Sequence, residues 1–256
     1  MTQRSLQKWH GAGNDFLVDV TTPEGASWWN PERALALCDR HRGVGADGLL
    51  VAALGDDVVT MTLFNADGSL AEMSGNGIRC LVAAVQRSSG DHRSSRRVST
   101  ATGVREVAIQ VQGDHRKGSV SMGAVTLLAP LPGALGVASV GNPHVVVRDN
   151  ASWNTRDRED LAEKLSTSVG GANVEFVTVT SRRSVDICVV ERGVGWTLAC
   201  GTGSVAVVKV LFDLGEVDDC VVVTNPGGDL EVTLQNGEAT LAGPVAFVAD
   251  VTWDVS

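Results

Sequence analysis

The chain has 256 residues, of which 43% are hydrophobic and 20% are charged, and its formal net charge at pH 7 is −9. This length accommodates one large domain or two of ordinary size, each with its own core. The negative charge argues against a nucleic-acid partner, because phosphate binding requires clustered positive charge, and no apolar stretch reaches membrane-spanning length.

The first half of the chain reads as strands around a few helices. Asn30 and Pro31 are typical of a helix start and predict a helix to about Asp39. A second helix is predicted over 75–85. The polar and basic stretch 86–99 is interpreted as a solvated loop, with a partner site as the alternative. Apolar runs predict strands at 48–53, 58–64, 104–111 and 120–128.

The second half repeats this organisation after a segment rich in Pro and Gly, 127–136. Helices are predicted at 156–165 and 201–212. Strands are predicted at 137–148, 174–180, 185–190, 221–224, 229–234 and 239–242. Each half therefore reads as strands surrounding one central helix, which is an α+β class. We expect an N-terminal lobe of residues 1–126, joined by a returning strand within 245–256, and a C-terminal lobe of residues 127–244.

Two segments of the chain resemble each other at a fixed offset of 126 residues. Residues 65–77 and 191–203 each end in a small nucleophilic residue, Ser74 or Cys200, before a glycine-rich helix start. The same offset relates the apolar runs 59–64 and 185–190, and the register holds without a gap from Gly45 to Cys80. This predicts a duplicated unit whose two helix starts face each other across one cleft.

A helix N-terminus presents unpaired N–H groups and a partial positive charge. The glycine turns 75–77 and 201–203 let a ligand carboxylate approach those groups. The same field lowers the pKa of a thiol, which makes Cys200 a candidate thiolate base; the alternative is a small buried residue. Two opposed residues of this kind suit removal of a proton from one face of a carbon and its return to the other.

Other chemistries fit the sequence less well. No phosphate-binding GxxxxGK[ST] motif is present, the Gly-x-Gly elements lack a dinucleotide-type setting, and no lysine stands in a pyridoxal context, so no cofactor is expected. Five cysteines without a CxxC pair, with scattered histidines and no apolar leader in 1–15, predict reduced thiols in the cytoplasm and no metal site.

Several spaced motifs together resemble diaminopimelate epimerase, a family of cofactor-independent amino-acid epimerases. They are 10–16 (HGAGNDF), 65–80, 141–144 (GNPH), Asn173 and 191–203, and they cover nearly the whole chain in the same order. The resemblance implies two pseudo-symmetric lobes, each a curved mixed β-sheet or barrel wrapped around a central helix. It also implies stereoinversion of LL- to meso-diaminopimelate, a diamino dicarboxylate of lysine and cell-wall precursor synthesis.

The resemblance implies a role for each matched position. Ser74 and Cys200 would be the catalytic pair, and His144 and Glu191 would tune the thiols and orient the reacting amino group. The amides of Gly75, Asn76, Gly201 and Thr202 would bind the carboxylate of the reacting centre. The distal end of the substrate would be held by Asn14, Asn65, Asn142, Asn173 and Arg192. Taken singly, each Asn would be interpreted as a turn or cap residue, and Glu191, Arg192 and His144 as solvated charges or loop side chains. The complete set favours ligand binding.

Two departures from the family pattern stand out. The family has cysteine where this chain has Ser74, either as an introduced substitution or as a natural variant with altered chemistry. Cys80 is a poor substitute, because six residues along a helix place it about 9 Å away. Trp196 stands where the family more often has glutamate; it is interpreted as a packing residue, with a narrowed cleft as the alternative.

Other readings remain open. A related epimerase or dehydratase acting on another amino acid, such as a hydroxyproline, would also use a Ser/Cys pair. A catalytically impaired protein that binds a diamino acid is a second alternative, and an interaction protein without a small-molecule site is disfavoured by the many Asn and Gly positions. A homodimer is expected on general frequency alone.

Overall fold

The computed structural model describes residues 2–90, 93–113 and 115–255, which fold into two compact units. The first unit comprises Met1–Val120 and Gly243–Ser256, and the second comprises Ser121–Ala242. The borders expected from the sequence, 126/127 and 244/245, fall a few residues beyond these positions. Both observed borders lie inside strands that run from one unit into the other, β8 (His115–Ala124) and β17 (Glu238–Val255).

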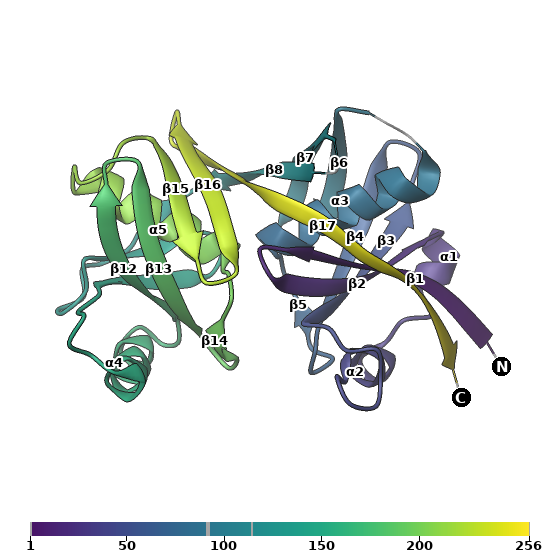
Figure 1. The fold of residues 1–256 in the computed structure, drawn as a ribbon, viewed down its shortest axis with the longest axis horizontal. Helices are drawn as coiled ribbons and strands as arrows, with labels where there is room; N and C mark the ends of the chain where they lie inside the picture. The colour runs from purple at the N-terminus through teal and green to yellow at the C-terminus, as the bar shows by residue number, and fades with distance from the viewer. Residues whose placement is uncertain (1, 91–92, 114, 256) are drawn as a thin grey trace. The chain divides into compact units, whose positions relative to one another are not determined.

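The first unit is a barrel around a helix (Figure 1). Its elements are β1 (Thr2–Gly11), β2 (Asn14–Thr21), α1 (Pro23–Ala26), α2 (Pro31–Cys38), β3 (Gly48–Leu54), β4 (Val58–Asn65), β5 (Leu70–Ala71), α3 (Gly75–Ser89), β6 (Ser95–Thr100), β7 (Gly103–Gln112) and β8. In the described part of the chain, β1, β2, β3, β4, β6, β7 and β8 pair in that order, and β17 pairs with both β1 and β8. The pairs β2–β3 and β4–β6 are parallel, so the sheet is mixed.

Helix α3 supplies the core of this barrel. Every residue from Gly75 to Val85 is buried, and the helix packs against β1, β2, β3 and β7. A helix apolar on all sides is stable only when it is enclosed. The shorter α2 packs against the outer side of the sheet, where Leu37 joins Leu17, Leu49 and Trp29 in a second apolar cluster.

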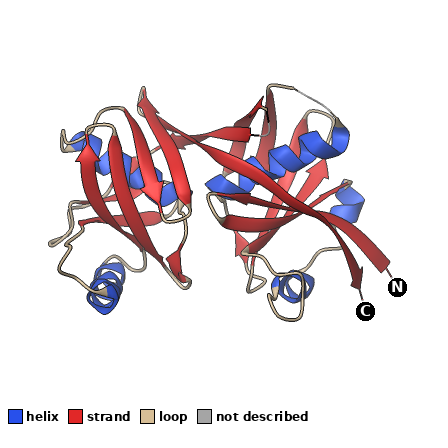
Figure 2. Cartoon of the chain, in the orientation of Figure 1, coloured by secondary structure: helices blue, strands red, loops and turns tan. Residues whose placement is uncertain are grey.

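The second unit repeats this plan. Its elements are β9 (Thr126–Leu127), β10 (Gly136–Ser139), β11 (Pro143–Arg148), α4 (Thr155–Ser168), β12 (Asn173–Ser181), β13 (Ser184–Glu191), β14 (Gly195–Thr197), α5 (Gly201–Asp213), β15 (Cys220–Asn225), β16 (Gly228–Gln235) and the start of β17. Helix α5 packs against β10, β11, β12 and β16, and α4 packs against β12 (Figure 2). The α+β class expected from the sequence is confirmed, with a central helix in each unit.

The offset of 126 residues seen in the sequence is also present in the structure. Strand β4 begins at Val58 and β13 at Ser184, and helices α3 and α5 begin at Gly75 and Gly201. The same parallel pairing precedes both hairpins, β2 with β3 and β11 with β12. The two units are therefore duplicated in backbone as well as in sequence.

Some predicted elements were wrong in extent. The run 137–148 is two strands, because Gly141 adopts φ 96° and turns the chain between β10 and β11. The expected loop 86–99 contains the end of α3, which Gly90 terminates at φ 64°, and the start of β6, which pairs parallel with β4 around the buried Val98; its residues 91–92 lie outside the described part. Strands β1 and β2 were not predicted, because their apolar residues are interrupted by charged ones.

The last strand begins before the expected returning segment, 245–256. Strand β17 runs over 18 residues, pairs with β16 at its start and with β1 from Ala246 to Val255. None of the helices in the described part of the chain combines the length and the apolar composition that a membrane span requires.

Candidate active site

The two helix starts have the same local geometry. Ser74 is the N-cap of α3, and its Oγ accepts a hydrogen bond from the Gly77 amide at 3.0 Å. Cys200 is the N-cap of α5, and its Sγ accepts from the Gly203 amide at 3.4 Å. Both residues have extended backbones, as N-caps do. Each side chain thus lies at the positive end of a helix, beside the first-turn amides that the sequence assigned to carboxylate binding.

The thiol of Cys200 is surrounded by polar groups within the second unit. Only 5% of Cys200 is exposed. Its sulfur lies 3.5 Å from the Thr202 hydroxyl and 4.0 Å from Asn173 Nδ2, and its backbone amide donates to Asn225 Oδ1 at 3.4 Å. These contacts hold the sulfur in place at the start of α5.

The expected direction of the Cys200 pKa is wrong. Burial raises the pKa of this thiol well above its usual value, and the carboxylates of Glu191 and Glu175 raise it further, whereas the hydrogen bonds from Thr202 and Gly203 lower it. The helix field is therefore outweighed by desolvation and by two negative neighbours. Cys200 rests as a thiol and needs a base to become a thiolate.

Glu191 is placed to be that base. It lies at the end of β13, accepts from the Thr197 hydroxyl at 2.7 Å and is hydrogen-bonded to the Cys200 side chain. Burial raises the pKa of Glu191, and the negative charge of Glu175 adds to that shift. A carboxylate with a raised pKa is a better proton acceptor for a thiol than an ordinary one.

His144 forms a second buried pair in the same unit. Its Nδ1 lies 2.7 Å from Oε1 of Glu175, and both side chains are fully buried. Its Nε2 lies 3.1 Å from Oδ1 of Asn142. Glu175 was not predicted from the sequence.

The same cluster has the composition of a metal site. Among the described residues, one ligand atom each from His144, Glu175 and Cys200 lies within 4.8 Å of the others. Imidazole, carboxylate and thiolate are ligands that Zn²⁺ accepts. The imidazole and the carboxylate are already bonded to each other at 2.7 Å, and the sulfur caps a helix. We therefore interpret the cluster as a proton-transfer network.

The predicted polar residues of the second unit are partly brought together. Asn173 Oδ1 accepts from the Arg192 backbone amide at 3.0 Å, which links the start of β12 to the turn after β13. The Arg192 side chain is exposed and donates to the Gly171 carbonyl at 3.4 Å. Asn142, Asn173, Glu191 and Cys200 thus share one region of the unit, with the Arg192 side chain at its exposed edge.

The predicted residues of the first unit form a smaller network. Asn14 lies between Asp47, whose Oδ2 accepts from its Nδ2 at 2.8 Å, and Asn76, whose Nδ2 donates to its Oδ1 at 3.4 Å. Asn65 donates to the Ser69 hydroxyl at 2.9 Å inside the turn that follows β4. Asn65 therefore has the contact of a turn residue.

Arg79 is a further residue that the sequence did not single out. It is fully buried in α3 and donates to the Gly75 carbonyl at 2.9 Å and to Asn76 Oδ1 at 2.8 Å. Burial lowers the pKa of Arg79 to about 10, so the group stays cationic near neutral pH. This charge lies under the first turn of α3 and adds to the positive end of the helix. Burial also raises the pKa of the adjacent Cys80 thiol to about 12.

The interpretation of Trp196 as a packing residue fits its contacts. Its Nε1 donates to Glu159 of α4 at 2.7 Å, and its ring lies 6.3 Å from that of Phe176. The indole is thereby tied to the outer helix of its own unit.

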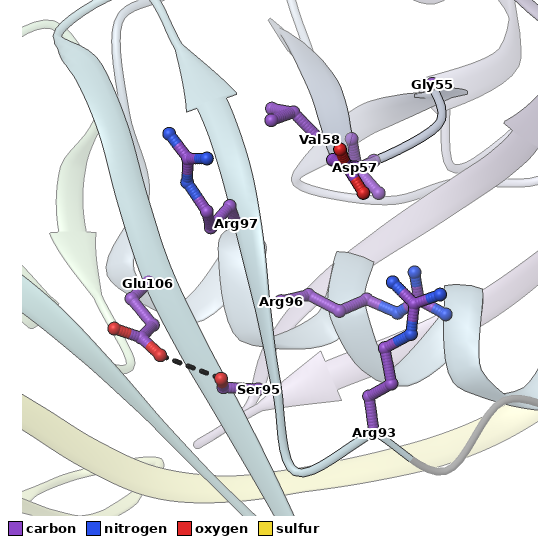
Figure 3. A pocket seen from close by; sticks show the side chains of 9 residues that line it. Gly55, Asp57, Val58, Arg93, Ser95, Arg96, Arg97 and Glu106 are labelled. Carbon is purple, nitrogen blue, oxygen red and sulfur yellow. Dashed lines mark hydrogen bonds between the residues drawn. The ribbon is translucent and has the colours of Figure 1, made fainter.

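A hollow in the first unit contains none of the predicted residues (Figure 3). It is lined by Gly55, Asp57, Val58, Val59, Arg93, Ser95, Arg96, Arg97 and Glu106. Ser95 donates to Glu106 at 2.7 Å across it. Arg93, Ser95, Arg96 and Arg97 of this hollow follow the C-terminal end of α3, whereas Ser74 precedes its start; a 15-residue helix spans about 22 Å.

The close approach of Glu175 to Gly203 predicts that alanine is tolerated less well at position 203 than at the matching position 77. A Cβ at Gly203 would lie 2.5 Å from Glu175 Oε1, whereas at the matching Gly77 the nearest atom, Ser74 Cβ, would be 3.1 Å away. We expect Gly203→Ala to lower the free energy of unfolding by about 1–3 kcal/mol, as overpacking does. Thermal unfolding of both variants checks this, with Gly77→Ala as the matched control. Equal melting temperatures for the two would contradict the close contact with Glu175.

Comparisons with known proteins show the family to which the chain belongs. The family model of diaminopimelate epimerase matches residues 6–128 and 136–248. Diaminopimelate epimerase of Synechocystis sp. is 35% identical over 95% of this chain and 96% of its own length. The enzyme of Clostridium perfringens is 32% identical over 97% of this chain and 98% of its own length.

Solved structures share the fold at low sequence identity. A predicted epimerase from Pseudomonas aeruginosa has a TM-score of 0.75 and 15% identity over 99% of this chain and all of that one. A hydroxyproline epimerase from Agrobacterium vitis, with bound trans-4-hydroxy-L-proline, has a TM-score of 0.74 and 16% identity over 99% of this chain and 91% of that one. With a family model matched over nearly its whole length and relatives above 30% identity, the chain belongs to the diaminopimelate epimerase family.

Proposed function

We propose that this protein inverts one α-carbon of 2,6-diaminopimelate, converting the LL isomer to the meso isomer without a cofactor, in lysine and peptidoglycan precursor synthesis. The observation that carries the proposal is the matched pair of helix starts, each capped by a proton-transfer side chain and followed by Gly-x-Gly. Family membership supports this substrate over others.

The first half of the reaction uses the second unit. The substrate carboxylate binds the amides of Gly201 and Thr202, where the helix dipole stabilises negative charge. Glu191 takes the thiol proton of Cys200, and the thiolate then removes the α-proton of the substrate. The negative charge left on the α-carbon is delocalised into the carboxylate that the helix amides hold.

The second half uses the first unit. Ser74 donates its hydroxyl proton to the opposite face of the α-carbon, while the amides of Gly75 and Asn76 and the charge of Arg79 stabilise the carboxylate. Water then returns a proton to the Ser74 oxygen, and Glu191 releases to water the proton that it took from Cys200, so the cycle closes without a net gain or loss of protons. Serine does this less readily than cysteine, because its hydroxyl is much less acidic than a thiol, whose ordinary pKa is about 8.5.

The distal amino-acid end needs directional partners. Arg192 suits a carboxylate, because its guanidinium can form two parallel hydrogen bonds. We assign the remaining polar contacts to Asn14, Asn65, Asn142 and Asn173, with the Asn65 assignment resting on the resemblance alone.

Proton exchange in D₂O tests the proposal. With LL-diaminopimelate, we expect meso-diaminopimelate to appear with deuterium at the inverted α-carbon, followed by NMR and mass spectrometry. Exchange on hydroxyproline but not on diaminopimelate would support the alternative that the Ser/Cys pair favours. Diaminopimelate binding in calorimetry without any exchange would support a binding protein instead.

The cellular setting stays a prediction. All five cysteines are free in the structure, as expected for a reducing cytoplasm. A homodimer is expected, and light scattering would measure it.

A further inference from the structure

Glu175 is a buried charge that the proposed reaction has not used. It lies on β12, and its side chain is fully buried. Oε1 lies 2.7 Å from His144 Nδ1, and among the described residues Oε2 is buried without a hydrogen-bond partner. Burial of a carboxylate is costly unless its charge is paired and its oxygens are hydrogen-bonded. The position therefore calls for an explanation.

The fold itself does not need an acid at this position. Leu50 occupies the same place in the first unit: it pairs with Leu63 of β4 as Glu175 pairs with Val189 of β13, and it is also fully buried. Leu50 also pairs with Val18 across parallel strands β2 and β3, as Glu175 pairs with Val146 across β11 and β12. A leucine thus satisfies the packing of this position in the duplicated unit.

The surroundings of Glu175 are adapted to hold its carboxylate. Val174 and Phe176 on either side of it face the apolar cluster under α4, so Glu175 points to the other face of β12, toward α5. There the glycine at position 203 leaves the room that Oε1 occupies. The carboxylate is therefore aimed at the imidazole from a fixed position.

We propose that Glu175 is a positioning residue, which holds the proton of His144 on Nδ1 and thereby makes Nε2 the atom that exchanges a proton during epimerisation. The proposal rests on the proposed function and adds a residue to it. An ionised carboxylate can only accept, so the proton of this contact stays on Nδ1. Nε2, which lies 3.1 Å from the Asn142 side-chain amide, then accepts from that amide with its NH₂ group rather than its oxygen facing the ring. When Nε2 gains a proton from a reacting group, the imidazolium is stabilised by Glu175, which itself gains none. Carboxylates behind catalytic histidines in serine hydrolases act in this way.

The test is Glu175→Gln, which keeps the shape of the side chain and removes its charge. We expect kcat for diaminopimelate to fall about 10²-fold, with KM changed less than threefold, because Glu175 does not touch the substrate. In ¹⁵N NMR of histidine-labelled protein, His144 should carry its proton on Nδ1 in the wild type and lose that preference in the variant. The five histidines are distinguished by the signal that disappears in His144→Asn.

Two controls separate positioning from folding. Glu175→Leu copies the matching residue of the first unit, so it should fold with a normal melting temperature and have the same low kcat. Glu216→Gln removes an exposed carboxylate that pairs with Arg148 in the same unit and should leave kcat and the His144 signal unchanged.

The outcomes distinguish a failure of the role proposed for Glu175 from a failure of the proposed epimerase activity. An unchanged Nδ1 signal in Glu175→Gln, or a kcat within threefold of wild type, would overturn the role of Glu175. If the wild type does not turn over diaminopimelate, the proposed function fails, and the His144 spectrum alone then decides whether Glu175 fixes the imidazole.

Discussion

Cys200→Ala is expected to abolish nearly all deuterium uptake at the α-carbon, with a loss of about 10²–10⁴-fold in kcat. The thiol at the start of α5 is the group that removes the α-proton in the proposed reaction. Alanine also removes the cap on the Gly203 amide, which costs about 1 kcal/mol or less of stability for a sulfur cap. The loss of rate should therefore far exceed the loss of folding, and circular dichroism should show a native spectrum.

An exposed cysteine provides the control for Cys200. Cys220 lies at the start of β15, where its sulfur accepts from the Thr233 hydroxyl, and Cys220→Ala should exchange deuterium at the wild-type rate. A Cys200→Ala enzyme with more than a tenth of the wild-type rate would show that another group removes the proton.

The pH dependence of the wild-type activity should show the ionisation of Glu191, the proposed base for the Cys200 thiol. Glu191 must be ionised to accept the Cys200 proton, and its pKa is raised by burial. Activity should therefore be lost on acidification at a pH above the ordinary glutamate value of about 4.3. In Glu191→Gln this acid limb should disappear, together with most of the rate.

Ser74→Cys is expected to raise kcat by about 10–100-fold, because general acid–base catalysis improves as the pKa of the group approaches the working pH. The second unit shows that a thiol fits this position, since Cys200 caps α5 with an extended backbone like that of Ser74.

A control variant shows whether the increase in kcat depends on the position of the new thiol. Ser152 is exposed and outside both helix starts, so Ser152→Cys should leave kcat unchanged. A Ser74→Cys protein that binds diaminopimelate in calorimetry but still exchanges no deuterium would favour the reading of this chain as a binding protein. An unchanged rate in an active enzyme would mean that Ser74 is not the second proton-transfer group.

The repeat in the sequence accounts for the parts of the site that could be predicted. An offset of 126 residues located both N-caps and both glycine turns, because N-caps and glycines act through local backbone geometry. The buried charges of Glu175 and Arg79 could not be predicted, because in both cases distant parts of the chain cause the burial. Glu175 follows an apolar residue in a strand and reads as solvent-facing, but helices cover both sides of β12, so the alternation of apolar and polar residues fails there.

The burial of Arg79 and the pKa of Cys200 also depend on residues that are distant in the sequence. Arg79 stands in an apolar helix whose enclosing barrel is made by strands from distant parts of the chain, including β17. The thiol pKa depends on Glu191 and Glu175, which come from two further strands. Long-range packing decides these properties, and a local motif carries no information about it.

Strand β17 imposes an order on the maturation of this protein. Its part from Gly243 onward supplies the first unit with the neighbour of β1, yet this part is translated after every residue of the second unit. On the ribosome the N-terminal barrel must wait, one strand short, while the C-terminal unit is being made. Deletion of the C-terminal part of β17 would therefore destabilise the N-terminal unit, which is synthesised first.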